Sequence, residues 1–427
     1  MPQANDILGM NARNQDFVSQ NSAIAKSIAN SKIASNLLLE QRGLPTPKIF
    51  GLLATPEDVH DFDWDTLIEN FVIKPTNGLA GKGVVVFRKK LPTKQVWVDA
   101  LGRHWQLDDL KLHCFDILDG QYSRFGPQHN VIIQERIPIH PTFSKYVFKG
   151  TPDIRIIVYN RVPVMAMLRL PTKESEGRAN VHQGAIAAGI DIATGITTSA
   201  CTGKGIEIEF VPDTKYKLRG IRIPQWKKCL TTAVDTAVAA DMPYCGIDLF
   251  LHVEKGPMVV ELNARPGLTI QVANQAGLRR RLERVRDLNV LNTEHGVKVG
   301  QALFAASFSD KIISEEGLTI INPIENVIVY DKNKTGREVK ALINTGRLRT
   351  AISEALAKEL GLIDPDNLLW YQQEKKEDLA PVVEVIIRVK RRRIKTAAVV
   401  SKRLNKTSQH VELGRRDLSG FLVSTNV

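Results

Sequence analysis

The chain has few of the features that mark secreted, membrane or zinc-binding proteins. Its 427 residues include only four cysteines, Cys114, Cys201, Cys229 and Cys245, which lie far apart and form no CxxC pair. This spacing indicates neither a zinc site nor a disulfide framework, and it favours a reducing compartment. The segment MPQANDILGMNARN has no basic region followed by an apolar stretch, and no window reaches the roughly 18 apolar residues of a membrane span. We therefore expect a cytoplasmic protein without membrane insertion.

Internal repeats and low-complexity linkers are also absent from the sequence. The apolar content of 43% is ordinary for a globular protein, and the length suffices for two or three domains. The net charge of +12 is uneven, because residues 322–427 hold 20 Lys and Arg against 13 Asp and Glu. That excess favours an acidic partner. Since the pattern becomes β-rich after Asn322-Pro323, we expect one domain at 1–320 and a second at 321–427. Before that boundary the pattern predicts helices at 226–241 and 269–287 and a strand at VPVMAMLRL.

A β-hairpin is predicted for IDLFLHVEKGPMVVEL, residues 247–262. Its two halves alternate in hydrophobicity, and the segment EKGP is suited to reversing the chain between them. We expect Val253 to pair with Met258 across this four-residue loop. Alternate apolar residues of both halves, including Val253 and Val260, would then face a core.

This register places Asp248 opposite Asn263 and Phe250 opposite Glu261. Because opposed side chains share a face of a sheet, Asp248, Glu261 and Asn263 would lie together. Carboxylate and amide oxygens with open positions suit Mg²⁺, which keeps waters and takes phosphates as further ligands. The alternative is a solvated strand face without a metal.

A glycine-rich turn follows a lysine in FVIKPTNGLAGKGVVVF. Lys74 ends the first strand, and Gly78, Gly81 and Gly83 lie in the turn to the next one. Glycines let backbone N–H groups approach phosphates closely, and the lysine adds a positive charge. The segment is neither a Walker A loop nor a GxGxxG fingerprint. A hairpin that covers a nucleotide fits better, although such glycines can also serve a turn alone.

Two further segments carry polar residues between apolar runs. DIRIIVYN places Asp153 and Arg155 on one strand face, where the arginine suits phosphate or carboxylate oxygens or forms an ion pair with the aspartate. RANVHQGAIAAGID places Arg178, Asn180 and His182 in a glycine-bounded loop, and such loops often surround sites. A single histidine like His182 can equally be structural.

The order of these pieces resembles the ATP-grasp superfamily. The resemblance rests on Lys32 in SKIASNLLLEQRGLPTPKIFG, Lys74 with its glycine-rich turn, QERI at 134–137, DIR at 153–155, and the trio Asp248, Glu261 and Asn263. Within the superfamily, PDIRIIVYNRVPVMAMLRLPT and RANVHQGAIAAGID are similar to the glutamate-ligase-like, or sugar-transfer-associated, branch. The resemblance covers roughly residues 6–287. Only 31 residues precede Lys32, so we expect the pre-grasp part to be missing or rudimentary.

The resemblance implies an α+β fold in which two subdomains clasp ATP. It also implies a carboxylate–amine ligase that phosphorylates a carboxylate with ATP and then forms an amide or peptide bond, releasing ADP and phosphate. Glutamate or an acidic peptide is the implied carboxylate substrate, and the amine acceptor would be a peptide, a protein terminus, an amino sugar or a cell-envelope precursor.

The same resemblance assigns roles to named residues. Lys32, Lys74, Gly78, Gly81, Lys82 and Gly83 would hold or cover the phosphates, and the hinge Gln134, Glu135 and Ile137 would meet adenine, with backbone groups offered by Gln134 and Ile137. One or two Mg²⁺ ions, or Mn²⁺ in their place, would be held by Asp248, Glu261 and Asn263. The acyl phosphate or the substrate carboxylate would face Arg155, Asn180, His182 and Arg265. The competing hypothesis is a catalytically silent nucleotide-binding scaffold or regulator with a peptide-binding C-terminal module.

The C-terminal part resembles a small retropepsin-like barrel. VKALINTGRLRTAISEALAKELGL is similar to its first half, and HVELGRRDLSGFLV is similar to the closing strand of the ATP-dependent zinc proteases. The position that should hold the catalytic aspartate is Asn344, and an amide cannot act as the general base of an aspartic protease. Residues 322–427 also contain one histidine, His410, and no cysteine. We therefore expect a non-proteolytic module rather than a peptidase or a zinc enzyme.

The run KRRRIK at 390–395 is the most basic segment of this part. Nucleic-acid binding is disfavoured, because neither interleaved aromatic residues nor a groove-reading helix accompanies the run. A charged turn or an edge strand protected by its lysines and arginines fits better. The oligomeric state cannot be read from the sequence.

Overall fold

A computed structural model describes residues 6–67, 69–76, 82–92, 95–122, 130–305, 319–375 and 378–424. The chain forms two compact units, the first made of Met1–Ile190 with Gly195–Arg286 and the second of Asp191–Thr194 with Asp287–Val427. The division falls before the expected boundary near 320, because helix α9 (Thr293–Phe304) belongs to the second unit. The His295 ring of α9 lies 2.9 Å, at Nε2, from the carbonyl oxygen of Leu369.

The first unit opens with short helical segments. Among the described residues ahead of Lys32 there is no strand, and the segments are α1 (Met10–Ala12), η2 (Arg13–Phe17), η3 (Val18–Gln20) and α2 (Ala23–Asn30), followed by α3 (Lys32–Gln41). Ser22 and Ser31 cap α2 and α3, because each side chain accepts a hydrogen bond from a backbone N–H of the first turn. Lys32 is therefore the first residue of a well-capped helix.

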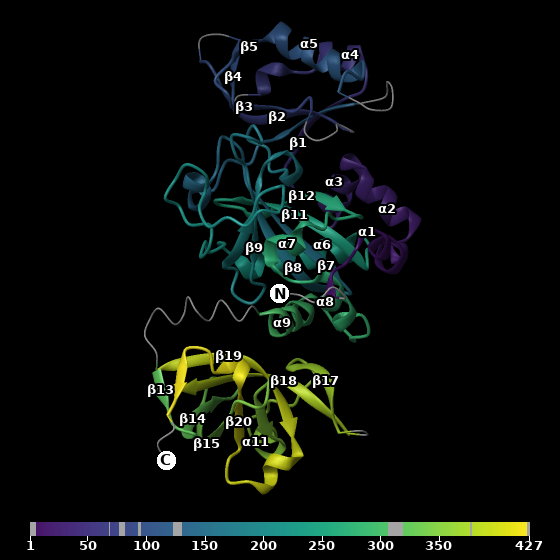
Figure 1. Cartoon of the computed structure of the whole chain (residues 1–427). Coiled ribbons are helices and arrows are strands. Elements are labelled where there is room, and N and C mark those ends of the chain that lie inside the picture. Colours follow the sequence, from purple (N-terminus) through teal and green to yellow (C-terminus); the bar gives the residue numbers. More distant parts are fainter. Residues whose placement is uncertain are drawn as a thin grey trace. The chain divides into compact units, whose positions relative to one another are not determined.

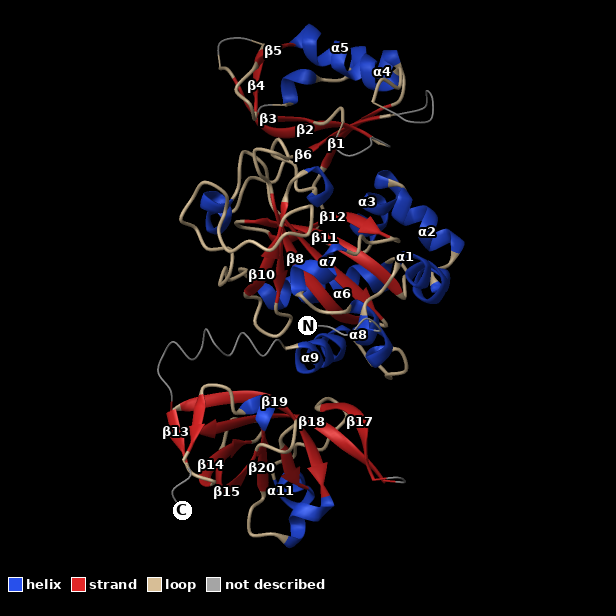
Figure 2. Cartoon of the chain, in the orientation of Figure 1, coloured by secondary structure: helices blue, strands red, loops and turns tan. Residues whose placement is uncertain are grey.

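A six-stranded sheet with two helices on one side forms the first subdomain (Figures 1 and 2). Its strand order is β1-β6-β2-β3-β4-β5. The bounds are β1 Ile49–Leu53, α4 Pro56–Asp61, η4 Trp64–Thr66, β2 Glu69–Pro75, β3 Val85–Lys90, β4 Val96–Asp99, β5 His104–Gln106, α5 Leu107–Leu118 and β6 Val131–Glu135. Phe71, Phe87 and Trp97 pack between the sheet and α5 and are fully buried.

The second subdomain is a six-stranded antiparallel sheet covered by helices. Its order is β10-β9-β8-β7-β11-β12, and α6, α7 and α8 pack on its strands. The bounds are η5 Pro141–Tyr146, β7 Asp153–Tyr159, β8 Val162–Leu170, η6 Val181–Gln183, β9 Ile186–Ile190, β10 Thr197–Cys201, α6 Trp226–Ala239, β11 Tyr244–His252, β12 Gly256–Asn263, α7 Thr269–Asn274 and α8 Leu278–Val285. The helix predicted for 269–287 is in fact two, because Gln275 adopts a left-handed conformation with φ 46°.

The second unit contains a closed six-stranded barrel. Strands β14, β15, β20, β16, β19 and β18 form a ring, which closes because β14 pairs with both β15 and β18. The bounds are β13 Thr319–Ile321, β14 Ile324–Tyr330, β15 Gly336–Asn344, β16 Ala351–Ser353, α11 Glu354–Glu359, β17 Leu368–Lys375, β18 Asp378–Val389, β19 Arg392–Ser401, η7 Lys402–Lys406, β20 Val411–Gly414, η8 Arg415–Asp417 and β21 Phe421–Val423. The predicted small β-rich barrel is therefore confirmed.

The basic run 390–395 forms the β18–β19 turn and the start of β19. Lys390 and Lys395 pair with Glu325 and Glu384 at 2.8 and 3.0 Å. The Arg392 guanidinium stacks over Phe421 and that of Arg393 over Tyr330. The interpretation as a charged turn is confirmed, and much of the charge is matched within the unit.

Two expectations from the composition concern the cysteines and membrane-spanning helices. The four cysteines are buried and free, so none forms a disulfide. No helix in the described ranges has the length and apolar character needed to cross a membrane.

The barrel core provides a test of the second unit. Ile387 on β18 is fully buried between neighbouring strands, so Ile387→Ala should destabilise this unit by about 2–5 kcal/mol through lost contacts and a residual cavity. Leu379→Ala on the same strand is the matched control, because Leu379 is 68% exposed and should change stability little. Urea unfolding of both variants checks this, and equal effects would contradict the assigned core.

Candidate functional site

The hairpin of β11 and β12 has a different register from the predicted one. Asp248 lies opposite Glu261, Gly246 opposite Asn263, and Phe250 opposite Met258. The predicted pairs Asp248 with Asn263 and Phe250 with Glu261 are wrong. The loop is also shorter, because His252 pairs with Gly256 and only residues 253–255 connect the strands.

Two local features produce this register. Gly256 adopts a φ of +82°, which lets the chain turn after three residues and places the glycine inside the strand. A β-bulge then makes Val260 an extra residue, because Leu249 pairs with Val259 while Asp248 pairs with Glu261. Without the bulge, Asp248 would oppose Val260 and the carboxylate of Glu261 would point to the other face.

The predicted grouping of the three oxygen-bearing residues survives the change of register. Asp248 and Glu261 are direct partners and Asn263 lies two residues further along β12, so the three share a face. The Asn263 Nδ2 donates to Asp248 Oδ2 at 3.3 Å. Two core assignments are wrong, since Val253 is a half-exposed loop residue and Val260 lines a cavity.

A row of buried charges crosses the sheet on this same face. Arg155 lies opposite Asp248 on β7 and donates from Nε and Nη2 to both carboxylate oxygens at 2.7 and 2.6 Å. Arg169 on β8 lies opposite Asp153, binds it in a bidentate pair, and donates from Nη2 to Asp248 Oδ2 at 2.6 Å. The ion pair proposed within β7 is therefore wrong, because Asp153 and Arg155 pair with different strands.

These arginines control the carboxylates around them. Burial alone would raise the pKa of Asp248, but Arg155 and Arg169 outweigh it and lower the pKa to about 2. Glu261 lacks such a pair, so desolvation and the charge of Asp248 raise its pKa. Asp248 is thus ionised at any physiological pH, and its charge crowds the neighbouring Glu261.

A cavity of about 370 Å³ lies over the same face. Six predicted site residues line it, namely Lys32, Lys74, Gln134, Glu261, Asn263 and Arg265. They come from α3, both sheets and the loop after β12, which are far apart in the sequence. The fold therefore joins the lysines to the carboxylate and amide in one cavity.

The two lysines are held in this cavity with few partners. Lys32 Nζ donates to the Pro75 carbonyl oxygen at 3.2 Å, and Lys74 Nζ donates to Gln134 Oε1 at 2.6 Å. Burial lowers the pKa of Lys32. Burial and the charge of Lys32 lower the pKa of Lys74 to about 8. Two desolvated ammonium groups that repel each other are suited to binding an anion with several negative oxygens.

The glycine-rich turn is described only at its end. Gly78 and Gly81 lie outside the described residues, and Lys82 is exposed. Gly83 has a φ of +73° and lies against the Tyr122 ring, where a Cβ atom would come within 2.7 Å. The His113 ring lies 3.0 Å, at Nε2, from the Gly83 carbonyl oxygen, so this glycine is needed for the local packing.

The hinge residues are occupied by internal bonds. Gln134 lies within β6 and pairs with both Ile49 and Val72, so its backbone belongs to the sheet and its side chain faces the cavity. The expected backbone contact of Gln134 with adenine stays a prediction. The Glu135 N–H donates to the Lys48 carbonyl oxygen, and its carboxylate pairs with Lys255. The Ile137 carbonyl oxygen accepts a bond from Thr151 Oγ1 at 2.8 Å.

The remaining predicted residues lie outside the cavity lining. Asn180 caps η6, because its Oδ1 accepts a bond from the His182 N–H at 3.1 Å, and the His182 side chain is exposed. Arg155 is not among the residues that line the cavity, and its guanidinium is hydrogen-bonded to Asp248. A catalytic role for Asn180 and His182 remains a prediction.

Two residues near the site were not assigned to it from the sequence. The sequence predicts Asp153 only as a partner for Arg155 and predicts no role for Arg169. The available signal was a lone charge inside the apolar strand VPVMAMLRL. The described ranges contain no cluster of three His, Cys, Asp or Glu able to hold a metal, and the predicted trio includes an amide.

The comparison with protein families identifies the first unit. The model of the sugar-transfer associated ATP-grasp family matches residues 12–287. The chain belongs to this family. The match ends where the first compact unit ends, so the barrel lies outside the ATP-grasp part.

The relatives of this ATP-grasp protein are distant. It is 26% identical over 248 residues to a probable alpha-L-glutamate ligase of Thioalkalivibrio sulfidiphilus, covering 58% of this chain and 60% of the relative. A probable alpha-L-glutamate ligase of Legionella pneumophila is also 26% identical, covering 58% and 59%. The chain thus spans about 60% of the length of these curated relatives.

The solved structures that resemble this chain are less similar to it in sequence than these relatives. A D-alanine–D-alanine ligase of Bacillus anthracis complexed with ATP has 16% identity and a TM-score of 0.35, with 70% of this chain and 71% of that chain covered. D-cycloserine synthetase DcsG has 13% identity and a TM-score of 0.34, with 62% and 69% covered.

The depressed pKa of Lys74 predicts a pH-dependent cost in stability. Its pKa falls from 10.5 to about 8 on folding, so the unfolded chain binds more protons between these values and stability rises with pH there. Lys74→Met should therefore stabilise the protein at pH 7, by roughly 1–3 kcal/mol because the cavity leaves the ammonium partly solvated. This advantage should shrink as the pH rises through 8 towards 10.5.

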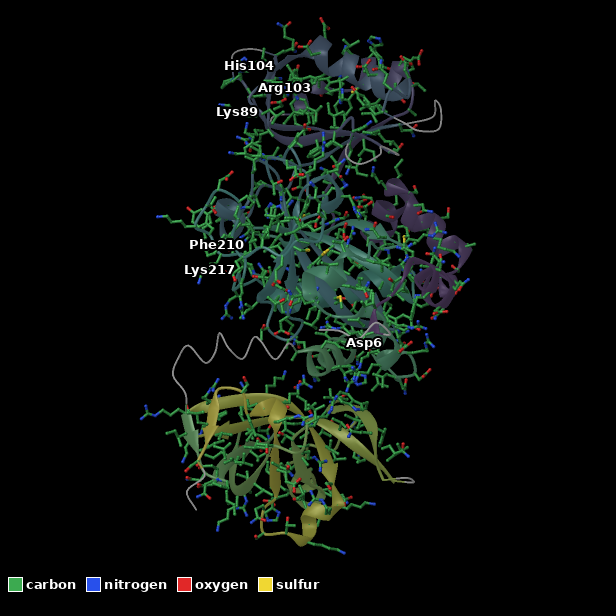
Figure 3. All side chains as sticks on the ribbon, viewed as in Figure 1. Asp6, Lys89, Arg103, His104, Phe210 and Lys217 are labelled. Atoms are coloured by element: carbon green, nitrogen blue, oxygen red, sulfur yellow. The ribbon has the colours of Figure 1, made fainter. Side chains whose placement is uncertain are left out.

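Chemical denaturation at pH 7 and pH 9.5 measures the difference. Lys89→Met is the matched control, because Lys89 is exposed on β3 of the same subdomain (Figure 3) and should show little effect at either pH. A Lys74→Met effect that is the same at both pH values would contradict the assigned environment.

Proposed function

We propose that the protein is an ATP- and Mg²⁺-dependent, ADP-forming carboxylate–amine ligase. The observation that carries this proposal is the cavity in which Lys32 and Lys74 face Glu261 and Asn263. Two desolvated cations suit a polyphosphate, and the oxygen ligands beside them suit a divalent cation that accompanies it. Membership of the ATP-grasp family supports the same chemistry.

The oxygen ligands fit a divalent cation. Burial and the charge of Asp248 raise the pKa of Glu261, and a divalent cation held by these residues would relieve the repulsion between the two carboxylates. Glu261 and Asn263 line the cavity and offer a carboxylate and an amide oxygen, and Asp248 shares their face of the sheet. When bound, Mg²⁺ would neutralise charge on the phosphate oxygens, and Mn²⁺ would serve the same role.

The proposed reaction proceeds in two balanced steps. An oxygen of the substrate carboxylate takes the γ-phosphoryl group of ATP, and the β–γ bridging P–O bond breaks to release ADP. The amine nitrogen then attacks the acyl carbon, the C–O bond to phosphate breaks, phosphate leaves with the electron pair, and the amine loses a proton. Lys32 and Lys74 would hold the phosphates, and Arg265 would face the carboxylate.

Glutamate or an acidic peptide is the proposed carboxylate substrate. This proposal is supported by the similarity to probable alpha-L-glutamate ligases and by the exposed Arg265 at the cavity. The amine would come from an amino acid, a peptide or a cell-envelope precursor.

A nucleotide-binding scaffold without turnover is the second candidate. It is favoured by one observation, that both oxygens of Asp248 already accept bonds from arginines. In that case the cavity would bind ATP while Asp248 stays with Arg155 and Arg169.

For the second unit we propose a non-proteolytic, retropepsin-like module. Asn344 ends β15, and its side-chain oxygen accepts a bond from the Arg347 N–H at 3.2 Å, so the amide stabilises the turn. Peptide binding would be its remaining role. A catalytic residue mapped inside 322–427 in a peptide-cleaving preparation would overturn this proposal.

Substrate-stimulated ADP release tests the ligase. The wild type, supplied with ATP, Mg²⁺ and a panel of amino acids and acidic peptides, should release ADP only with a productive pair. Glu261→Ala should lower that rate by about 100-fold or more, because a group that stabilises phosphoryl charge is lost. Glu254→Ala is the matched control, since Glu254 lies exposed in the loop of the same hairpin.

The outcomes separate the two candidates. ATP binding without substrate-stimulated ADP release across the panel would favour the scaffold. Unchanged ADP release by Glu261→Ala would remove Glu261 from the site.

A further inference from the structure

The two arginines that contact Asp248 differ in how their own charge is matched. Arg169 is bound in a bidentate pair by Asp153, which is 6% exposed, and adds one bond to Asp248 Oδ2 at 2.6 Å. Arg155 makes its side-chain hydrogen bonds within the described residues to Asp248 alone. Arg169 thus has a carboxylate of its own, whereas Arg155 depends on Asp248.

This difference matters when Asp248 shares its charge with a cation. Arg169 would remain neutralised by Asp153, so its bond to Asp248 could persist. Arg155 would lose the one carboxylate to which it is hydrogen-bonded within the described residues, and this is unfavourable for a buried guanidinium unless another anion approaches it. Gly267 lies beside this guanidinium and leaves room next to it, since a Cβ atom on Gly267 would be in ordinary contact with Arg155 Nη1 at 3.8 Å.

We propose that Arg169 and Asp153 form a charge-neutral pair that positions Asp248 for the divalent cation, while Arg155 is the arginine released to the anionic ligand. This inference rests on the proposed ligase function and assigns Arg169 as a positioning residue. Its register supports the role, since Arg169, Asp153, Arg155 and Asp248 lie on three adjacent strands whose pairing fixes their order. Without Asp153, the guanidinium of Arg169 would have no carboxylate of its own to hold it beside Asp248.

The metal affinity provides the direct test. Mn²⁺ binding to the full chain is titrated by electron paramagnetic resonance with a non-hydrolysable ATP analogue present. The double variant Asp153→Asn with Arg169→Gln removes the pair without leaving a buried unpaired charge, so it should fold. We expect its Mn²⁺ affinity to fall by about 10–100-fold, as for lost partners that orient metal ligands.

Arg155→Met and Arg88→Met complete the comparison. Arg155→Met should keep the Mn²⁺ affinity within about threefold of wild type and lose ADP formation even at saturating metal, whereas the double variant should regain most of its kcat there. Arg88→Met, at an exposed position on β3, should match the wild type in both measurements. Arg169→Lys keeps a charge but not the fork, and should recover part of the lost affinity.

Each result has a defined meaning. An unchanged Mn²⁺ affinity in the double variant, or an equal loss in Arg155→Met, would overturn the division between the arginines while leaving the ligase proposal intact. Absence of nucleotide-dependent Mn²⁺ binding in the wild type would instead remove the proposed function and this inference with it. Circular dichroism of every variant identifies any loss of fold.

Discussion

Asp248 accepts hydrogen bonds from Arg155 and Arg169 inside the second sheet, and much of the site follows from this contact. Charged groups can be buried there only because each one faces an opposite charge across a strand pair. This pairing of opposite charges links β8, β7 and β11. Glu261, opposite Asp248, extends the row to β12. It keeps Asp248 ionised and places Glu261 beside a fixed negative charge.

The cavity next to this row of paired charges holds positive charge instead. Lys32 and Lys74 are drawn from α3 and β2 into a partly desolvated space, where burial disfavours their charged forms. Such an arrangement lowers the stability of the free protein and favours a ligand that supplies negative charge. Lys32 and Lys74 thus line the same cavity as Glu261 and Asn263, and we propose that bound ions balance the charge of both groups.

Local sequence patterns predicted the elements well where a short-range rule applies. The apolar runs around Lys74, Arg155 and Arg169 became β2, β7 and β8, because alternation and β-branched residues favour strands over these lengths. The pattern predicted the wrong helix length or strand register where a single residue changes the backbone conformation. Gln275, in a left-handed conformation, breaks the predicted helix 269–287, and Gly256 together with the Val260 bulge shifts the hairpin register. Neither a bulge nor a positive φ at Gln275 has a distinctive signal in one sequence.

The sequence by itself determined the residue types of the site, their order along the chain and their assignment to strands, turns and the first turn of a helix. Those properties depend on neighbouring residues, and the resemblance to the ATP-grasp superfamily joined Lys32 to Lys74, Glu261 and Asn263. The tertiary structure alone decided which charges meet. Arg169 and Asp153 became partners, and Arg155 turned to Asp248, because strand pairing brings residues close that lie 16 and 93 positions apart. The electrostatic energy of a charge pair depends on the distance between the charges and on their burial. The separation of two residues along the chain gives neither quantity.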